Sequence, residues 1–303
     1  MIVAEAKQHE LAHRFAVVNG VRLHYVEAGQ GPLVVLLHGF PQYWYLWRHQ
    51  LRALAAAGFR AVAPDLRGYN LSDKPSGVAS YRMSALVDDV VGLVRHLGAE
   101  RATVVGHDWG GVVAWNAAMR HPEVVERVAV LNAPHPAALS RELRNKNWKQ
   151  MWRSFYVLLF QLPRLPEAAL RAGGFAALRR IFREEPVREG AFEDEAVEHY
   201  VAALREPGTL RAALHYYRAA LRHRDVPPPD RRTIAQPALL LWGDRDPHLG
   251  IELSQGLERW VPGIRVEHLP DASHWVMEDA PERVGELLLE FVRDGRPPTT
   301  AGT

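Results

Sequence analysis

Short apolar runs alternate with helical stretches through the first half of the chain. Four solid apolar runs are typical of strands buried on both faces. They lie at residues 32–37, 59–64, 102–105 and 127–131. The stretches between them have helical periodicity and lie at residues 44–57, 83–97 and 112–120. This alternation predicts a parallel sheet covered by helices. Two further runs, 15–18 and 21–26, flank Asn19-Gly20 and predict an antiparallel hairpin at the start.

The alternation stops after residue 135, and the composition over 136–233 favours helices without a strand. Strand-like runs return at 237–242 and 264–269, and residues 282–293 form an amphipathic helical pattern. The pattern therefore predicts an α/β fold with a mostly parallel, doubly wound sheet. We expect a core in two parts, 1–135 and 234–303, around a helical insertion at 136–233, and disorder in the tail 295–303.

Composition narrows the class of protein. With 303 residues, 48% hydrophobic and 24% charged, the chain is typical of globular proteins. Its 37 basic and 35 acidic residues leave a net charge of only +2, so we expect no nucleic-acid partner. The absence of cysteine excludes disulfides, thiolate metal sites and a cysteine nucleophile. Neither a secretory leader nor an apolar run near the roughly 18 residues of a membrane span is evident, so we expect a cytoplasmic protein.

One glycine-rich turn carries the strongest chemical signal. Gly106-His107-Asp108-Trp109-Gly110-Gly111 follows a strand and opens a helix, the context of the nucleophile elbow, with Asp108 in the place of the usual serine. The alternative is a plain connecting loop in which Asp108 caps the helix, a role that aspartate favours.

Three further segments at strand ends complete this pattern. Acidic residues in Gly243-Asp244-Arg245-Asp246 and the base His274 follow the last two strands, at the sheet edge where α/β proteins place their sites. The spacing alone leaves the acid open between Asp244 and Asp246. His38-Gly39-Phe40 follows an earlier strand, so the backbone N–H groups of Phe40 and Trp109 are expected to form an oxyanion hole.

An aspartate in the elbow changes the expected reaction. Its carboxylate is ionised at pH 7 and suits attack on a saturated carbon, as in an epoxide or an alkyl halide, better than acyl transfer. Such an attack leaves an ester on Asp108. Neutral His274 would then deprotonate a water molecule that hydrolyses the ester, while the acid of the triad orients the imidazole.

These residues resemble the epoxide hydrolase family of the α/β-hydrolase superfamily. The resemblance rests on His38-Gly39-Phe40-Pro41, on Asp65-Leu66-Arg67-Gly68-Tyr69 leading to Ser72-Asp73-Lys74-Pro75, on the elbow, and on Ser273-His274-Trp275. It extends over about residues 15–293. It implies an epoxide hydrolase with a helical cap at 136–233 and Asp246 as the acid. It also implies an epoxide and water as reactants, with no cofactor.

The resemblance further implies two cap tyrosines, Tyr156 and Tyr217, that protonate the epoxide oxygen. Helical spacing supports Tyr217, which shares a stripe with Leu210, Leu214 and Leu221 and is expected to face inward, whereas Tyr216 lies off this stripe. His215-Tyr216 departs from the family's usual Asn-Trp. Tyr156 lies in an aromatic stretch that is equally compatible with a core position. Its apolar neighbours are Trp152, Phe155, Leu159 and Phe160.

Two alternatives remain open. A haloalkane dehalogenase shares the aspartate nucleophile, but that family usually has asparagine where this chain has Phe40, and a halide leaves without needing tyrosine protons. A fluoroacetate dehalogenase is disfavoured because its arginine is Trp109 here. The alternative from another class is a binding protein without catalysis, and the complete set Asp108, Asp246 and His274 argues against it. No metal or nucleotide motif is present, and a homodimer stays open.

Overall fold

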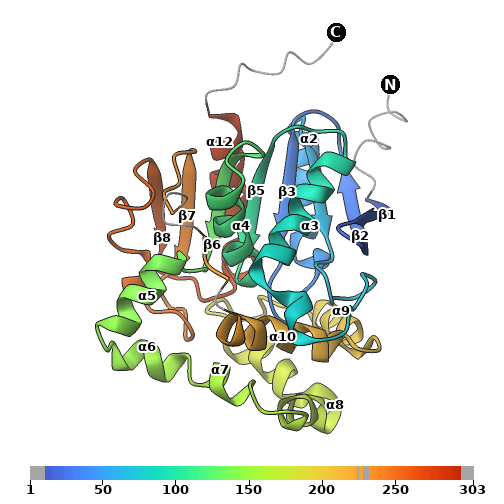
Figure 1. The fold of residues 1–303 in the computed structure, drawn as a ribbon, viewed down its shortest axis with the longest axis vertical. Helices are drawn as coiled ribbons and strands as arrows, with labels where there is room; N and C mark the ends of the chain where they lie inside the picture. The colour runs from blue at the N-terminus through green and yellow to red at the C-terminus, as the bar shows by residue number, and fades with distance from the viewer. Residues whose placement is uncertain (1–10, 224, 228–231, 295–303) are drawn as a thin grey trace.

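The computed structural model describes residues 11–223, 225–227 and 232–294, so the tail predicted to be disordered, 295–303, lies outside the described residues. Its centre is an eight-stranded sheet with the strand order β1-β2-β4-β3-β5-β6-β7-β8 (Figure 1). The strands are β1 (Ala12–Val18), β2 (Val21–Ala28), β3 (Leu33–Leu37), β4 (Arg60–Pro64), β5 (Ala102–His107), β6 (Val125–Leu131), β7 (Ala238–Gly243) and β8 (Ile264–Leu269). From β4 to β8 all neighbours are parallel, and β2 is antiparallel to both β1 and β4.

Local chemistry explains the antiparallel edge. Asn19 and Gly20 both have positive φ, 47° and 73°, as the tight turn of a two-residue hairpin requires. The predicted hairpin is therefore present, with longer strands than the apolar pattern indicated. Its outer strand β1 exposes Phe15 and Val17 while its alternate residues face the core.

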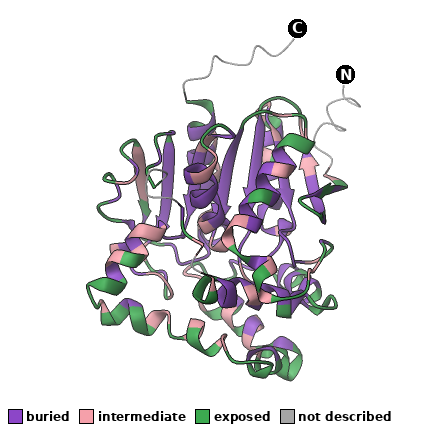
Figure 2. Cartoon of the chain, in the orientation of Figure 1, coloured by how far each residue is buried: buried purple, intermediate pink, exposed green. Residues whose placement is uncertain are grey.

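Helices cover both faces of the sheet, and each face has its own apolar core. Helices α3 (Met83–His96) and α4 (Trp109–Arg120) pack on one face, and α2 (Arg48–Ala56) and α12 (Pro281–Arg293) pack on the other. Figure 2 shows the central strands buried, whereas the edge strands β1 and β8 and the outer helix faces are partly exposed. The predicted α/β fold is confirmed. Helix α4 starts three residues earlier than its periodicity indicated, directly after Asp108.

In the described part of the chain, six α-helices lie between β6 and β7. They are α5 (Pro136–Arg144), α6 (Trp148–Arg153), α7 (Tyr156–Leu159), α8 (Leu165–Glu184), α9 (Asp194–Arg205) and α10 (Thr209–Arg222). These inserted helices lie beside the carboxyl ends of the parallel strands, in the lower part of Figure 1. Helix α8 bends at residues 172–175, which have non-helical backbone angles. Within the described ranges, no helix combines the length and the apolar character needed to cross a lipid bilayer.

Glycines allow β3, β5 and α4 to meet closely below the site. A Cβ atom on Gly110 would lie 2.2 Å from the Leu37 carbonyl oxygen, and one on Gly106 would lie 2.2 Å from the carbonyl oxygen of Gly110. Both distances are far inside van der Waals contact, and the opposing atoms are backbone that has little freedom to move. The elbow therefore depends on residues without a side chain at these two positions.

We expect Gly110→Ala to lower the free energy of unfolding by on the order of 3 kcal/mol, because the added methyl group forces α4 away from β3. Gly285→Ala is the matched control. Gly285 lies in α12 with nothing within 4 Å of an added Cβ, so alanine should stabilise the helix by about 0.4–1 kcal/mol. Urea unfolding of both variants measures the difference, and equal unfolding free energies would contradict the close approach.

Candidate active site

Asp108 occupies the sharp turn between β5 and α4. Its φ of 49° and ψ of −122° are rare for a residue with a side chain, and they point the carboxylate into a cavity. The backbone N–H of Phe40 donates a hydrogen bond of 2.8 Å to Asp108 Oδ1. A Cβ on Gly39 would lie 2.3 Å from the same oxygen, so glycine at 39 is what lets the Phe40 N–H approach it.

The surroundings of Asp108 act on its pKa in opposite directions. Desolvation raises the pKa of this carboxyl, whereas the charge of His274 and the backbone N–H groups of Trp109 and Phe40 lower it, and the net pKa is above the ordinary value. The two N–H groups thus converge on the carboxylate, in the arrangement expected of an oxyanion hole. Neighbours in the site therefore offset only part of the cost of removing this carboxylate from water.

His274 lies between two carboxylates. Its Nδ1 is 2.7 Å from Asp246 Oδ2, and its Nε2 is 3.7 Å from Asp108 Oδ2. Asp244, the alternative acid, points away and contacts His268 Nδ1 at 2.6 Å. The geometry thus separates the two aspartates that spacing left open, because only Asp246 reaches the imidazole.

Asp246 is held by more than the histidine. Its Oδ1 accepts hydrogen bonds from the backbone N–H groups of His248 (2.7 Å) and Leu249 (2.9 Å), and its Oδ2 accepts one from Asn132 Nδ2 at 2.8 Å. Burial raises the pKa of this carboxyl, but the charge and hydrogen bond of His274 outweigh burial, so the pKa is lowered. Asp246 is therefore a fixed negative charge.

Burial alone would lower the pKa of His274. The charge of Asp246, its hydrogen bond and the charge of Asp108 act against burial and raise the pKa to about 9. With both carboxylates ionised, the imidazole therefore carries a proton at neutral pH. His107 supports the same loop, since its Nε2 is 2.9 Å from the His274 carbonyl oxygen.

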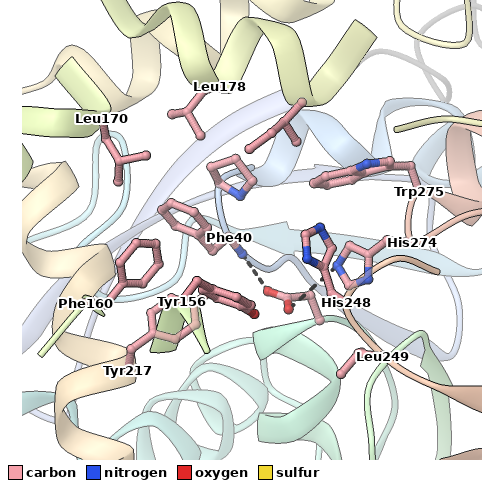
Figure 3. Close-up of a pocket in the computed structure, with 13 residues that line it drawn as sticks. Phe40, Tyr156, Phe160, Leu170, Leu178, Tyr217, His248, Leu249, His274 and Trp275 are labelled. Atoms are coloured by element: carbon pink, nitrogen blue, oxygen red, sulfur yellow. Dashed lines mark hydrogen bonds and ion pairs between the residues drawn. The ribbon is translucent and has the colours of Figure 1, made fainter. Parts of the chain in front are cut away.

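A cavity of about 220 Å³ opens in front of Asp108 (Figure 3). Side chains from the sheet loops and from the inserted helices line it together. They are Phe40, Pro41, Asp108, Tyr156, Phe160, Leu170, Leu178, Ile181, Tyr217, His248, Leu249, His274 and Trp275. The wall is mainly apolar, and its polar groups gather around the carboxylate.

Tyr156 and Tyr217 both line this cavity, with ring centroids 5.9 Å apart. In Figure 3 they lie on one side of the pocket, and His248 and His274 lie on the other. Burial raises the pKa of both phenols, and the nearby carboxylate of Asp108 acts in the same direction. Both tyrosines therefore keep the protons that they would donate.

The apolar stripe predicted for α10 agrees only in part with the side chains that are buried in the structure. Leu210, Leu214 and Tyr217 are buried as predicted, but Leu221 is exposed and Tyr216, which lies off the stripe, is fully buried. Tyr216 donates a hydrogen bond of 2.8 Å to the Arg67 carbonyl oxygen. The cause is that α10 packs on the sheet domain as well as on the other inserted helices, so it has two buried sides.

Glu185 and His248 were not identified from the sequence. Glu185, just after α8, binds His248 Nε2 at 3.0 Å and accepts a hydrogen bond of 3.2 Å from Trp275 Nε1. It therefore ties an inserted helix to the loops that carry Asp246 and His274. Asn132 was also missed, although its place directly after a strand is the signal that identified the other site residues. Within the described residues, no group of three or more acidic or histidine side chains is arranged to hold a metal ion.

Comparison with known proteins agrees with this geometry. A family model described as the alpha/beta hydrolase fold matches residues 32–281. The AB hydrolase superfamily protein YfhM of Bacillus subtilis is 40% identical over 93% of this chain and 98% of its own. Epoxide hydrolase 3 of Xenopus tropicalis is 38% identical over 91% of this chain and 76% of its own.

Solved structures similar to this chain are also epoxide hydrolases. The epoxide hydrolase of Bacillus megaterium, solved with an inhibitor, has a TM-score of 0.84 at 35% identity and covers 92% of this chain and 100% of its own. A mutant of that enzyme, with a TM-score of 0.85 at 36% identity over 92% of this chain and 100% of its own, was solved with its product, (R)-3-[1]naphthyloxy-propane-1,2-diol. The chain belongs to the α/β-hydrolase family and, within it, to the epoxide hydrolases.

We expect Asp246→Asn to lower the pKa of His274 below its value of about 9, because the substitution removes the main charge that opposes burial. NMR titration of the His274 ring measures this shift. Asp244→Asn is the matched control, since Asp244 contacts His268 and should leave the pKa of His274 unchanged. An unchanged pKa in Asp246→Asn would contradict the assignment of Asp246 as the partner of His274.

Proposed function

We propose that this protein hydrolyses epoxides to vicinal diols through a covalent ester on Asp108. The observation that carries the proposal is the placement of one carboxylate between two tyrosines and one histidine in a mainly apolar cavity. The named relatives support the same reaction class. We also propose that residues 136–233 act as a cap over the site, because the inserted helices supply about half of the cavity wall.

In the first step, Asp108 attacks one epoxide carbon and the carbon–oxygen bond of the ring breaks. Electron density moves to the epoxide oxygen, to which Tyr156 and Tyr217 both donate hydrogen bonds, and one of them transfers its proton and is left as a tyrosinate. The N–H groups of Phe40 and Trp109 orient the attacking carboxylate. The product of this step is an ester and one alcohol.

Ester formation changes the charge around His274. The ester is neutral, so the charge of Asp108 is lost from the three carboxylates, Asp246, Asp108 and Glu185, that raise the pKa of His274 to about 9. The pKa therefore falls, the imidazole returns its proton to the tyrosinate left by the first step, and neutral His274 can then accept a proton from water. That water attacks the carbonyl carbon of the Asp108 ester, and the N–H groups of Phe40 and Trp109 hold the oxyanion. The acyl carbon–oxygen bond then breaks, the leaving oxygen takes the remaining proton of the attacking water, and the diol departs with Asp108 ionised and His274 protonated as at the start. His274 thus becomes a neutral base only after the ester on Asp108 has formed.

The cavity favours an apolar epoxide. Phe160, Leu170 and Leu178 from the inserted helices face Trp275 across it. The B. megaterium relative forms a naphthyl diol, which agrees with an aromatic substituent on the substrate. We therefore propose aryl or other apolar epoxides as the substrate class.

The test is intact-mass spectrometry of His274→Ala after incubation with styrene oxide and, separately, with an alkyl bromide. Without the base, we expect the ester to accumulate as an adduct of the full epoxide mass on Asp108. Asp108→Asn is the control and should form no adduct. An adduct only from the bromide, without its halogen, would identify a dehalogenase. Binding without an adduct from either compound would favour a binding protein.

We expect Tyr217→Phe to slow adduct formation by about 10²-fold, the typical effect of losing one donor to a developing oxyanion. The rate is measured by mass spectrometry with the substitution added to His274→Ala. Tyr216→Phe is a closely matched control, because the neighbouring hydroxyl binds Arg67 and faces away from the cavity. Equal rates in the two variants would rule out proton donation by Tyr217.

A further inference from the structure

The outer edge of helices α6 and α7 exposes an unusual concentration of large apolar side chains. Of the fourteen exposed large apolar residues in the described chain, nine lie within residues 143–165. Six of them form what we call the apolar edge: Trp148, Met151, Trp152, Phe155, Leu158 and Leu159. The two tryptophans are 71% and 74% exposed, and Figure 2 shows these helices exposed along the rim of the molecule. A concentration of this kind indicates an interaction surface.

The apolar edge is separated from the substrate cavity by a single short helix. On α7 and the residue after it, Tyr156 and Phe160 line the cavity, whereas Leu158 and Leu159 face outward. Trp152 and Phe155 stack on each other with centroids 6.0 Å apart, outside any core. The aromatic stretch 152–160 therefore belongs neither wholly to the hydrophobic core nor wholly to the cavity wall. Its two sides have different surroundings, and one of them has no covering in the described chain.

The exposed charges of residues 142–171, the stretch that carries the apolar edge, all have one sign. Five exposed basic residues lie within 142–171, and none makes an ion pair with another described residue: Arg144, Lys146, Lys149, Arg164 and Arg171. The two acidic residues of this fully described stretch, Glu142 and Glu167, are buried and paired with Arg141 and Arg218. A partner that covers the apolar edge therefore meets five exposed basic side chains that no acidic residue of the same stretch neutralises.

We propose that the apolar edge docks this protein on the surface of a lipid bilayer that contains anionic phospholipids. Tryptophan, phenylalanine and leucine side chains would enter the boundary between headgroups and acyl chains, and the basic side chains would contact lipid phosphates. A second copy of the chain fits less well. A two-fold interface through this edge would set the same basic residues against each other without an acidic partner.

Docking in this orientation places the wall of the substrate cavity against the membrane. Epoxides dissolved in the bilayer would then reach Asp108 without crossing bulk water. This second part rests on the proposed hydrolase function, and the docking itself does not.

Sedimentation with vesicles tests the docking without any substrate. We expect the wild-type protein to bind vesicles of equal parts phosphatidylglycerol and phosphatidylcholine, and to bind pure phosphatidylcholine more weakly. Trp148→Ser/Trp152→Ser and Lys146→Glu/Lys149→Glu should each lower the partition coefficient about tenfold or more. The matched controls are Val17→Ser/Leu71→Ser, also exposed apolar residues, and Arg95→Glu/Arg101→Glu, with the same change in charge. Both controls should bind like wild type.

Turnover of dissolved styrene oxide, measured without vesicles, separates this proposal from the catalytic one. All four double variants should keep wild-type turnover, because none of these residues lines the cavity. Wild-type protein that does not bind anionic vesicles, or edge variants that bind as well as the controls, would overturn the docking proposal and leave the catalytic one intact. A dimer that dissociates in Trp148→Ser/Trp152→Ser with unchanged vesicle binding would assign the edge to self-association instead.

Discussion

Asp108 and Asp246 place two carboxylates on either side of one imidazole, at a depth where water does little to screen them. A single proton on His274 balances part of this charge, and backbone N–H groups balance much of the rest. Those N–H groups come from loops at different strand ends, so the sheet must hold the ends in register. The close contacts of Gly106 and Gly110 serve this purpose, because Gly110 lies directly against β3 and Gly106 lies directly against the first turn of α4.

The sequence predicts those parts of the molecule that depend on local rules. Asn19-Gly20 identifies its hairpin through turn chemistry, and strand ends identify Asp108 and His274 because the carboxyl ends of parallel strands share one edge. Local rules cannot separate Asp244 from Asp246, which differ in the direction that one short loop gives them. Resemblance to a family was needed for that choice, and in the structure Asp246 contacts His274 whereas Asp244 contacts His268.

The inserted helices were the least predictable part, because their positions depend on contacts between distant residues. Glu185 meets partners 63 and 90 positions away, and no periodicity signals such a pairing. The burial of Tyr216 was missed for a related reason. A stripe analysis assumes one buried side per helix, whereas α10 packs on two sides. Around α7 the sequence pattern overestimates burial. The aromatic and apolar residues there are compatible with a core position, and yet Phe155, Leu158 and Leu159 are exposed.

The cavity wall has two separate origins in the chain. The loops of the sheet carry Asp108 and His274, whereas Leu170 and Leu178 come from α8, which meets these loops at its far end through Glu185. A change in leucine size on α8 therefore reshapes the space for a substrate without altering the strand ends that carry Asp108 and His274. Evolution can therefore keep Asp108 and His274 unchanged while substitutions on α8 change the range of substrates that related proteins accept.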